Sequence, residues 1–131
     1  MPQRPVHDGL FTDEHLIGGR CSSCSRYHFP AAAICPYCGA REVERVALSH
    51  TGTLWGWTAV TAPPPGYRGD VPFGFGVVEL PEGIRVITRV EEPDPARLSF
   101  GMPVRFSTVP LHTDDEGTTV VTYTFVHTAA P

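Results

Sequence analysis

All four cysteines of the chain lie in residues 21–38, CSSCSRYHFPAAAICPYC, as two Cys-x-x-Cys pairs with ten residues between them. Each pair forms a tight turn that directs two thiolates toward one point, and two facing turns place four sulfurs in the tetrahedral geometry that zinc accepts. In the second pair, Pro36 favours the turn and Gly39 lets the backbone fold back. The pattern predicts a zinc ribbon whose ligands are Cys21, Cys24, Cys35 and Cys38.

Other uses of the four cysteines stay open at this point. Iron in a rubredoxin-like site is the main alternative metal, and a metal-free remnant held by packing is a further one. Disulfides are disfavoured in a reducing cytoplasm, and a redox Cys-x-x-Cys belongs to an α/β fold that this sequence does not suggest. Because four thiolates close the coordination shell, we expect the zinc to be structural. His28 lies between the pairs and is a weaker candidate ligand.

The composition describes a globular chain that can bury a core. The 131 residues are 41% hydrophobic and 18% charged, with a net charge of −4. The 14 prolines are roughly twice the usual share, which disfavours long helices and predicts a β-rich protein. No window reaches the roughly 18 apolar residues of a membrane span, and the N-terminal residues lack the apolar core of a signal peptide. We therefore expect a cytoplasmic protein without a membrane partner.

Short alternating segments rich in β-branched and aromatic residues follow the cysteines. Their period of two, with Gly, Pro and Asp between them, predicts five strands, at 51–62, 72–80, 83–92, 102–109 and 118–127. Five strands in this length fit the five-stranded OB-fold barrel best, with an SH3-like barrel or a small sandwich as the alternative. The predicted fold is mainly β: an N-terminal segment and rubredoxin-like zinc ribbon in residues 1–40, then an OB-fold domain in residues 41–131.

Alternation also predicts which faces of the strands are buried. Trp55 and Trp57 are two residues apart and are expected on one face, and Phe73 and Phe75 are expected in the core. In the segment 83–92, the alternation places Ile84, Val86, Thr88 and Val90 inward and Arg85, Ile87 and Arg89 outward.

Several motifs together resemble a known family. They are the ribbon ending in CPYCG, then GTLWGWTAV, PFGFGVVELPEG and LSFGMPVRF, and the likeness extends from about residue 9 to 127. The order resembles the acyl-CoA-associated family that joins a zinc ribbon to an OB-fold, known as domain of unknown function 35. The resemblance implies a non-catalytic subunit that binds a thiolase-superfamily chain, a lipid-transfer-protein-like thiolase or aldolase, in a heterotetramer. It further implies that the chain helps to form an acyl-CoA site, in some members for steroid side-chain degradation.

Six residues outside the ribbon are candidates for contact with the partner or with acyl-CoA. Trp55 and Trp57 could stack on a planar group or be covered by a partner. The proline-rich loop 62–72 can hold Tyr67 and Arg68 in a fixed pose, and arginine pairs well with phosphates. Arg85 and Arg89 flank Ile87 on an outward strand face whose composition suits a protein interface.

Two other classes of function are weighed against the accessory subunit. OB-folds and zinc ribbons bind single-stranded nucleic acid, but a chain of net charge −4 without lysine lacks the basic groove that such binding requires. An independent enzyme would need a catalytic set. The histidines His7, His15, His50, His112 and His127 are scattered, and Asp114, Asp115 and Glu116 suggest a solvated loop. We therefore expect no catalytic residue and no nucleic-acid partner.

Overall fold

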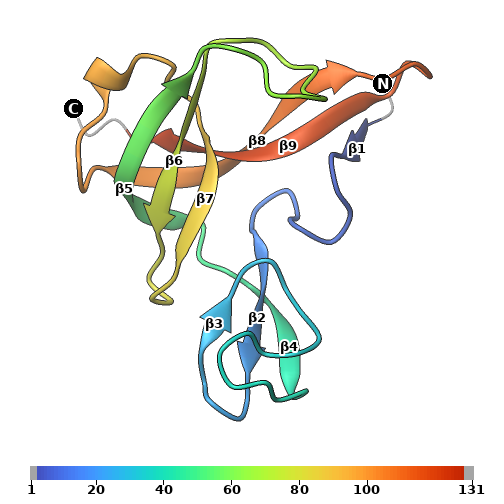
Figure 1. Ribbon diagram of the computed structural model, residues 1–131, viewed down its shortest axis with the longest axis vertical. Coiled ribbons are helices and arrows are strands. Elements are labelled where there is room, and N and C mark those ends of the chain that lie inside the picture. Colours follow the sequence, from blue (N-terminus) through green and yellow to red (C-terminus); the bar gives the residue numbers. More distant parts are fainter. Residues whose placement is uncertain (1–2, 129–131) are drawn as a thin grey trace.

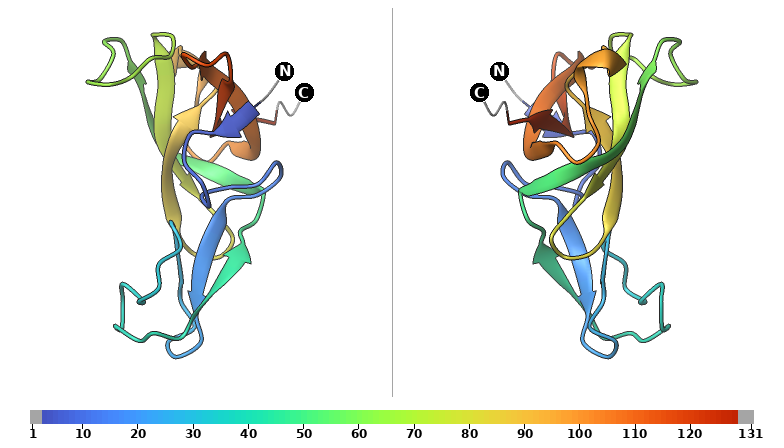
Figure 2. Two further views of the ribbon diagram at one scale, coloured as in Figure 1. Left: turned by 90° about the vertical axis from the view of Figure 1, so that its right-hand side faces the viewer. Right: turned by 90° about the vertical axis from the view of Figure 1, so that its left-hand side faces the viewer.

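The computed structural model describes residues 3–128, which form a β-barrel above a small three-stranded sheet (Figures 1 and 2). The small sheet holds β2 (Ile17–Cys21), β3 (Tyr27–His28) and β4 (Val43–Ala47) in the order β3-β2-β4. The larger sheet contains β1 (Gln3–Pro5), β5 (Thr51–Val60), β6 (Phe73–Glu79), β7 (Arg85–Val90), β8 (Pro103–Thr113) and β9 (Thr119–His127).

Strands β5 to β9 close into the predicted five-stranded barrel. The order in the larger sheet is β1-β9-β7-β6-β5-β8, and an additional β8–β9 pairing closes it. Most neighbours are antiparallel, but β7 and β9 are parallel and pair only at Val90 and Phe125 within the described residues. The barrel is therefore closed along most of its circumference and open beside β7.

Helical structure is minor. A single turn between β7 and β8 forms the 3-10 helix η1 (Pro95–Arg97), capped by the Asp94 side chain, which accepts a hydrogen bond from the Ala96 N–H. Within residues 3–128, no helix has the length and apolar character that crossing a membrane would require.

One hydrophobic core fills the barrel and extends to the ribbon. Leu54, Val78 and Phe125 are at most 1% exposed at its centre. Leu16 and Leu48, which border the ribbon strands, are fully buried in the same cluster. Burial of each such leucine contributes about 1.5–3 kcal/mol. The two leucines therefore anchor the small sheet to the base of the barrel.

The expectation that Trp55 and Trp57 share a face is wrong. A β-bulge falls between Leu54 and Gly56, so Leu54 pairs with Val78 and Trp57 with Gly76, both on the buried face of β6. Trp55, the extra residue, is left outward and 43% exposed. Because a bulge adds one residue to one strand, it reverses the alternation beyond it.

Phe73 and Phe75 are also placed differently from the expectation. Both side chains lie on the face of β6 opposite to Gly74 and Gly76. The face that carries the glycines is the buried one, and Phe75 is 38% exposed. A Cβ on Gly76 would clash with the carbonyl oxygen of Gly56, so only glycine lets β5 and β6 approach this closely. The phenylalanines therefore form part of the outer surface of the barrel.

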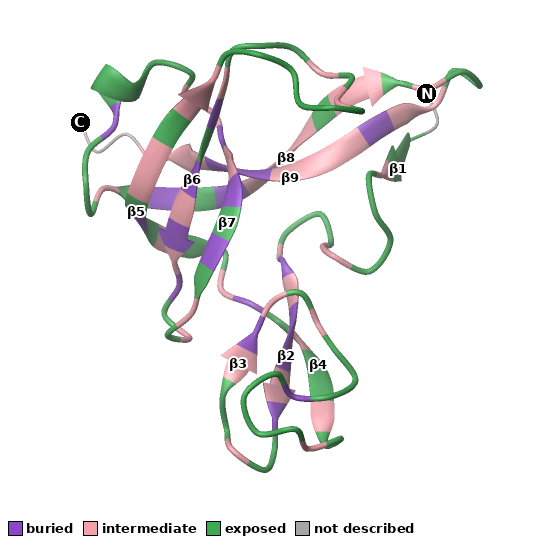
Figure 3. Cartoon of the chain, in the orientation of Figure 1, coloured by how far each residue is buried: buried purple, intermediate pink, exposed green. Residues whose placement is uncertain are grey.

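The alternation predicted for β7 is confirmed. Val86, Thr88 and Val90 are at most 2% exposed, whereas Ile87 is 61% exposed. In Figure 3 the two classes alternate along β7 as purple and green bands.

Candidate metal centre and adjoining surface

The two Cys-x-x-Cys turns are built in the same way. In the first, Ser25 N–H donates to the Cys21 carbonyl and Cys21 N–H donates to the Arg26 carbonyl. In the second, Gly39 N–H donates to the Cys35 carbonyl and Cys35 N–H to the Ala40 carbonyl. The fifth residue of each turn has positive φ, 65° at Ser25 and 78° at Gly39. The sequence indicated this conformation only at Gly39, because glycine adopts it freely and serine rarely does.

The turns bring the four predicted ligands together. All four sulfurs lie within 4.8 Å of one another, and the Sγ–Sγ distances are 3.6 Å for Cys21–Cys38 and for Cys24–Cys35. Tetrahedral zinc with Zn–S bonds of about 2.3 Å requires about 3.8 Å between sulfurs. Tyr37 N–H points to the Cys35 sulfur at 3.4 Å, as expected of a hydrogen bond that supports a metal thiolate. The residues present therefore fit a ZnS4 site.

The close packing of the four thiols shifts the pKa values of Cys35 and Cys38 in opposite directions. Burial by itself would raise the pKa of Cys35, but the N–H groups of Cys38 and Tyr37, together with hydrogen bonds to neighbouring thiols, lower it to about 6. The N–H of Ala40 lowers the pKa of Cys38, yet burial and the other sulfurs outweigh it and raise this pKa to about 11. One thiolate forms readily while four together repel, and a divalent cation removes that repulsion.

His28, the weaker candidate ligand, lies apart from this cluster. The metal-ligand cluster found among the described residues consists of the four cysteines alone. The His28 side chain is buried, and its Nε2 accepts a hydrogen bond from Ala32 N–H. His28 therefore supports the loop between the two turns.

Two of the six other candidates form a stacked pair on the outer face of the barrel. The Arg85 guanidinium lies 4.2 Å from the centre of the Trp55 ring, and its Nε donates to the Glu79 carboxylate at 3.1 Å. Phe100 extends the group, with its ring centre 6.4 Å from that of Trp55. Trp57 is not part of it, because its ring packs against the core and its Nε1 donates to the Pro95 carbonyl.

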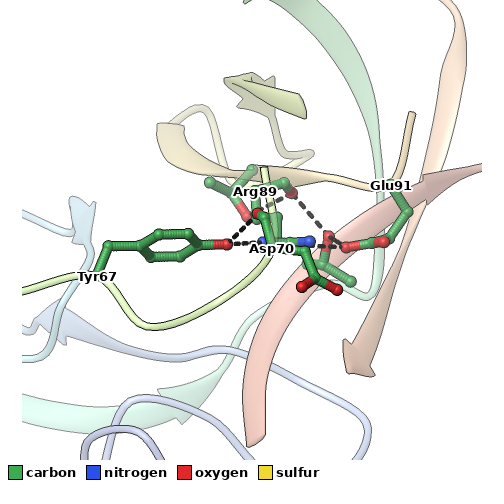
Figure 4. A network of polar contacts seen from close by, with 6 residues as sticks. Tyr67, Asp70, Arg89 and Glu91 are labelled. Carbon is green, nitrogen blue, oxygen red and sulfur yellow. Dashed lines mark hydrogen bonds and ion pairs between the residues drawn. The ribbon is translucent and has the colours of Figure 1, made fainter. Parts of the chain in front are cut away.

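Tyr67 and Arg89 meet in a polar network that ties the proline-rich loop to β7 (Figure 4). Arg89 Nη1 donates to the Tyr67 hydroxyl, which donates to the Asp70 carbonyl at 2.7 Å. Arg89 Nε donates to Glu91 at 2.6 Å. Burial alone would lower the pKa of Arg89, but the hydrogen bonds to Glu91 and Tyr67 raise it. The loop is thus held in one pose, while the Arg89 charge is already paired.

Arg68 remains at the surface. It lies 3.6 Å from Asp115, in the β8–β9 hairpin, and both side chains are more than half exposed. An exposed pair of this kind is weak and rearranges easily. Of the three arginines proposed for contact, Arg68 is therefore the most available to a new anion.

The outer face of β5, β6 and β7 holds apolar residues that the sequence reasoning did not select. Phe75 and Ile87 are exposed between the Trp55–Arg85 pair and the Tyr67–Arg89 network, and Phe100 is 69% exposed. The alternation along the strand predicted the outward direction of Ile87 only. Their exposure among residues 3–128 could not be predicted in this way, because it depends on the tertiary structure.

The fold and the four-sulfur centre define a protein that joins a zinc ribbon to an OB-fold barrel. Comparison with family models agrees: residues 11–44 match the rubredoxin-like zinc ribbon domain of ChsH2, and residues 45–109 match the C-terminal OB-fold domain of ChsH2. The metal is accordingly a structural zinc.

Similar proteins specify the family. A DUF35 domain-containing scaffold protein of Pyrococcus furiosus is 35% identical over 101 residues, covering 77% of this chain and 74% of its own. The benzoylsuccinyl-CoA thiolase subunit BbsA of Thauera aromatica is 34% identical over 77 residues, 59% of this chain and 52% of BbsA. The solved Ltp2-ChsH2(DUF35) aldolase superposes with a TM-score of 0.67 at 24% identity, over 95% of this chain and 98% of that one. The chain belongs to the DUF35 family.

Proposed function

We propose that this chain is a non-catalytic accessory subunit that binds a thiolase-superfamily chain and helps to form its acyl-CoA site. The partner is a lipid-transfer-protein-like thiolase or aldolase. Support comes from the similar proteins, which include a subunit of an acyl-CoA thiolase and a scaffold protein. The closed four-cysteine centre leaves no position for a substrate, which fits a non-catalytic role.

The observation that carries the proposal is the outer face of β5, β6 and β7. Its centre is apolar, with Trp55, Phe75 and Ile87 exposed. Arginine–glutamate pairs flank this centre, Arg85 with Glu79 and Arg89 with Glu91. An apolar, aromatic centre with arginine at its edge is the composition of a protein–protein interface.

We further propose that the chain contacts acyl-CoA directly. Tyr67 and Arg68 lie on the loop that reaches beyond the barrel beside the β8–β9 hairpin (Figure 1). Arg68 is exposed and can exchange Asp115 for a CoA phosphate, while Tyr67 holds the loop in place. Steroid side-chain acyl-CoA, which the family resemblance implies, is one substrate class we propose. The heterotetramer is proposed on the same resemblance.

Co-expression tests the proposal. The tagged chain is expressed with each thiolase-superfamily chain of its host in turn, and the product is weighed by light scattering with metal analysis. We expect a stable hetero-oligomer with one partner and about one zinc per copy. Turnover of a panel of acyl-CoA esters, steroid side-chain esters included, then defines the substrate. A chain that stays monomeric with every candidate contradicts the proposal and directs the search to single-stranded RNA and DNA.

A further inference from the structure

One edge of strand β7 is mostly unpaired within residues 3–128. Arg89 C=O accepts from the Thr124 hydroxyl and Glu91 N–H donates to the Phe125 carbonyl, so the backbone groups of odd-numbered residues point away from β6. From Arg85 to Arg89, no residue of β7 pairs with β9 in the part of the chain that the structure describes. Within residues 3–128, the N–H and C=O groups of Arg85 and Ile87 therefore have no hydrogen-bond partner on this edge.

Hollow surface lies along this edge. Beside Ile87 and Arg89 is an apolar groove of about 280 Å³, which we call the β7 groove, bounded also by Val6, Tyr67 and Tyr123. Beside Arg85 a second hollow of about 400 Å³ reaches to His28 and Tyr37 of the ribbon. A hollow therefore lies beside each end of β7, one next to the zinc ribbon and the other next to the proline-rich loop.

Carboxylates outnumber arginines in three segments next to the groove residues Tyr67 and Arg89: the proline-rich loop, residues 91–92 and the β8–β9 hairpin. Three of these carboxylates, Asp114, Asp115 and Glu91, are paired with Arg4, Arg68 and Arg89. Three more, Asp70, Glu92 and Glu116, have no basic side chain within 4.0 Å among the described residues. An excess of carboxylates favours a partner segment that carries lysine or arginine.

We propose that an extended segment of the partner chain adds to the free edge of β7 as a further strand. This inference rests on the proposed function, because the thiolase-superfamily partner supplies the segment. Its backbone pairs with Arg85 and Ile87, its apolar side chains fill the β7 groove, and flanking lysine or arginine pairs with the carboxylates of the neighbouring segments. An acyl chain in the same groove would leave the N–H and C=O groups of the edge unpaired, whereas a strand satisfies them.

Amide hydrogen exchange resolved to single residues tests this pairing. In the free chain, we expect the amides of Arg85 and Ile87 to exchange fast and those of Val86 and Thr88, which point to β6, to be protected. In the complex with the thiolase-superfamily partner, we expect the Arg85 and Ile87 amides to slow by at least about tenfold. Val86 and Thr88 serve as internal controls that change little.

Two substitutions at Ile87 separate the contribution of its backbone N–H to partner binding from that of its side chain. Ile87→Pro removes one N–H that points away from β6, a position where an edge strand tolerates proline. Ile87→Ala keeps that N–H and shortens the side chain. We expect Ile87→Pro to weaken partner binding roughly tenfold more than Ile87→Ala, the loss of about one hydrogen bond. If Ile87→Pro does not fold, the exchange measurement on the unaltered chain still decides.

The outcomes distinguish this inference from the proposed function. A stable complex in which the Arg85 and Ile87 amides stay fast overturns the strand addition and leaves the accessory role intact. No complex with any thiolase-superfamily chain overturns both. Protection that appears in the chain alone at high concentration, with acyl-CoA alone, or with a single-stranded oligonucleotide assigns the edge to a second copy or another ligand and overturns the inference.

Discussion

The zinc ribbon and the barrel are stabilised by different means, although both are small β-sheets. In residues 17–47 the buried apolar side chains are those of Cys21 and Cys35, two of the metal ligands. The barrel has a continuous core of leucine, valine and phenylalanine. The leucines that border the ribbon, Leu16 and Leu48, belong to that core. The ribbon therefore depends on a metal and on its attachment to the barrel, whereas the barrel is held by packing.

The largest expected effect comes from removing a metal ligand. Cys35→Ser should abolish zinc binding, because structural zinc contributes about 10–16 kcal/mol of apparent binding energy to such a site. The ribbon amides should then exchange freely while the barrel amides stay protected, and the partner complex should be lost. Metal analysis and hydrogen exchange measure these effects. A metal-free variant that keeps its ribbon protected and binds the partner would contradict the difference drawn between the two regions.

Substitution of an anchoring leucine should affect both regions together. Leu48 is fully buried, so Leu48→Ala should lower the free energy of unfolding by about 2–5 kcal/mol. The matched control is Ile34→Ala in the ribbon, where 46% exposure predicts a change within about 0.5 kcal/mol. Denaturant unfolding measures both. Equal effects of the two substitutions would show that the ribbon is not anchored through the barrel core.

A smaller effect is expected at the junction between the regions. The Glu82 carboxylate, at the β6–β7 turn, accepts hydrogen bonds from the N–H and hydroxyl of Ser49 at 2.8 and 2.9 Å. Glu82→Ala should cost about 1–3 kcal/mol, because it leaves the part-buried Ser49 groups without a partner. Glu79→Ala, which breaks an exposed pair with Arg85, is the control and should cost about 1 kcal/mol or less. If Glu82→Ala costs no more stability than Glu79→Ala, the Glu82–Ser49 contact does not stabilise the junction.

The smallest effect is pH-dependent and lies in the β8–β9 hairpin. Hydrogen bonding to Thr118 N–H, together with Arg4 and Glu116 N–H, holds the pKa of Asp114 below its ordinary 3.8. A depressed carboxyl pKa stabilises the fold above that ordinary value, and the contribution is lost as the pH falls through the folded-state pKa. Asp114→Asn should therefore lower the Tm at about pH 6 and make little difference at about pH 2. A difference that persists in acid would assign the effect to packing of the hairpin.

How far prediction succeeded depended on whether a feature is local. The turns around Cys21 and Cys35 were predictable because Cys-x-x-Cys spacing and metal geometry act over a few residues. The alternation of β7 was predictable for the same reason, since side chains of any strand alternate between its faces. The sequence did not reveal the bulge at Trp55, because a bulge is defined by the pairing of two strands.

The sequence by itself determined the metal centre, the five barrel strands and the outward direction of Arg85, Ile87 and Arg89. The tertiary structure alone decided which face of β6 is buried, because only the close approach of β5 makes glycine necessary at Gly76. It also decided that Leu16 and Leu48 join the barrel core and that, within residues 3–128, one edge of β7 is paired only at Val90. These features depend on how distant segments meet. Local periodicity describes the two faces of a strand but not what covers either face or either edge.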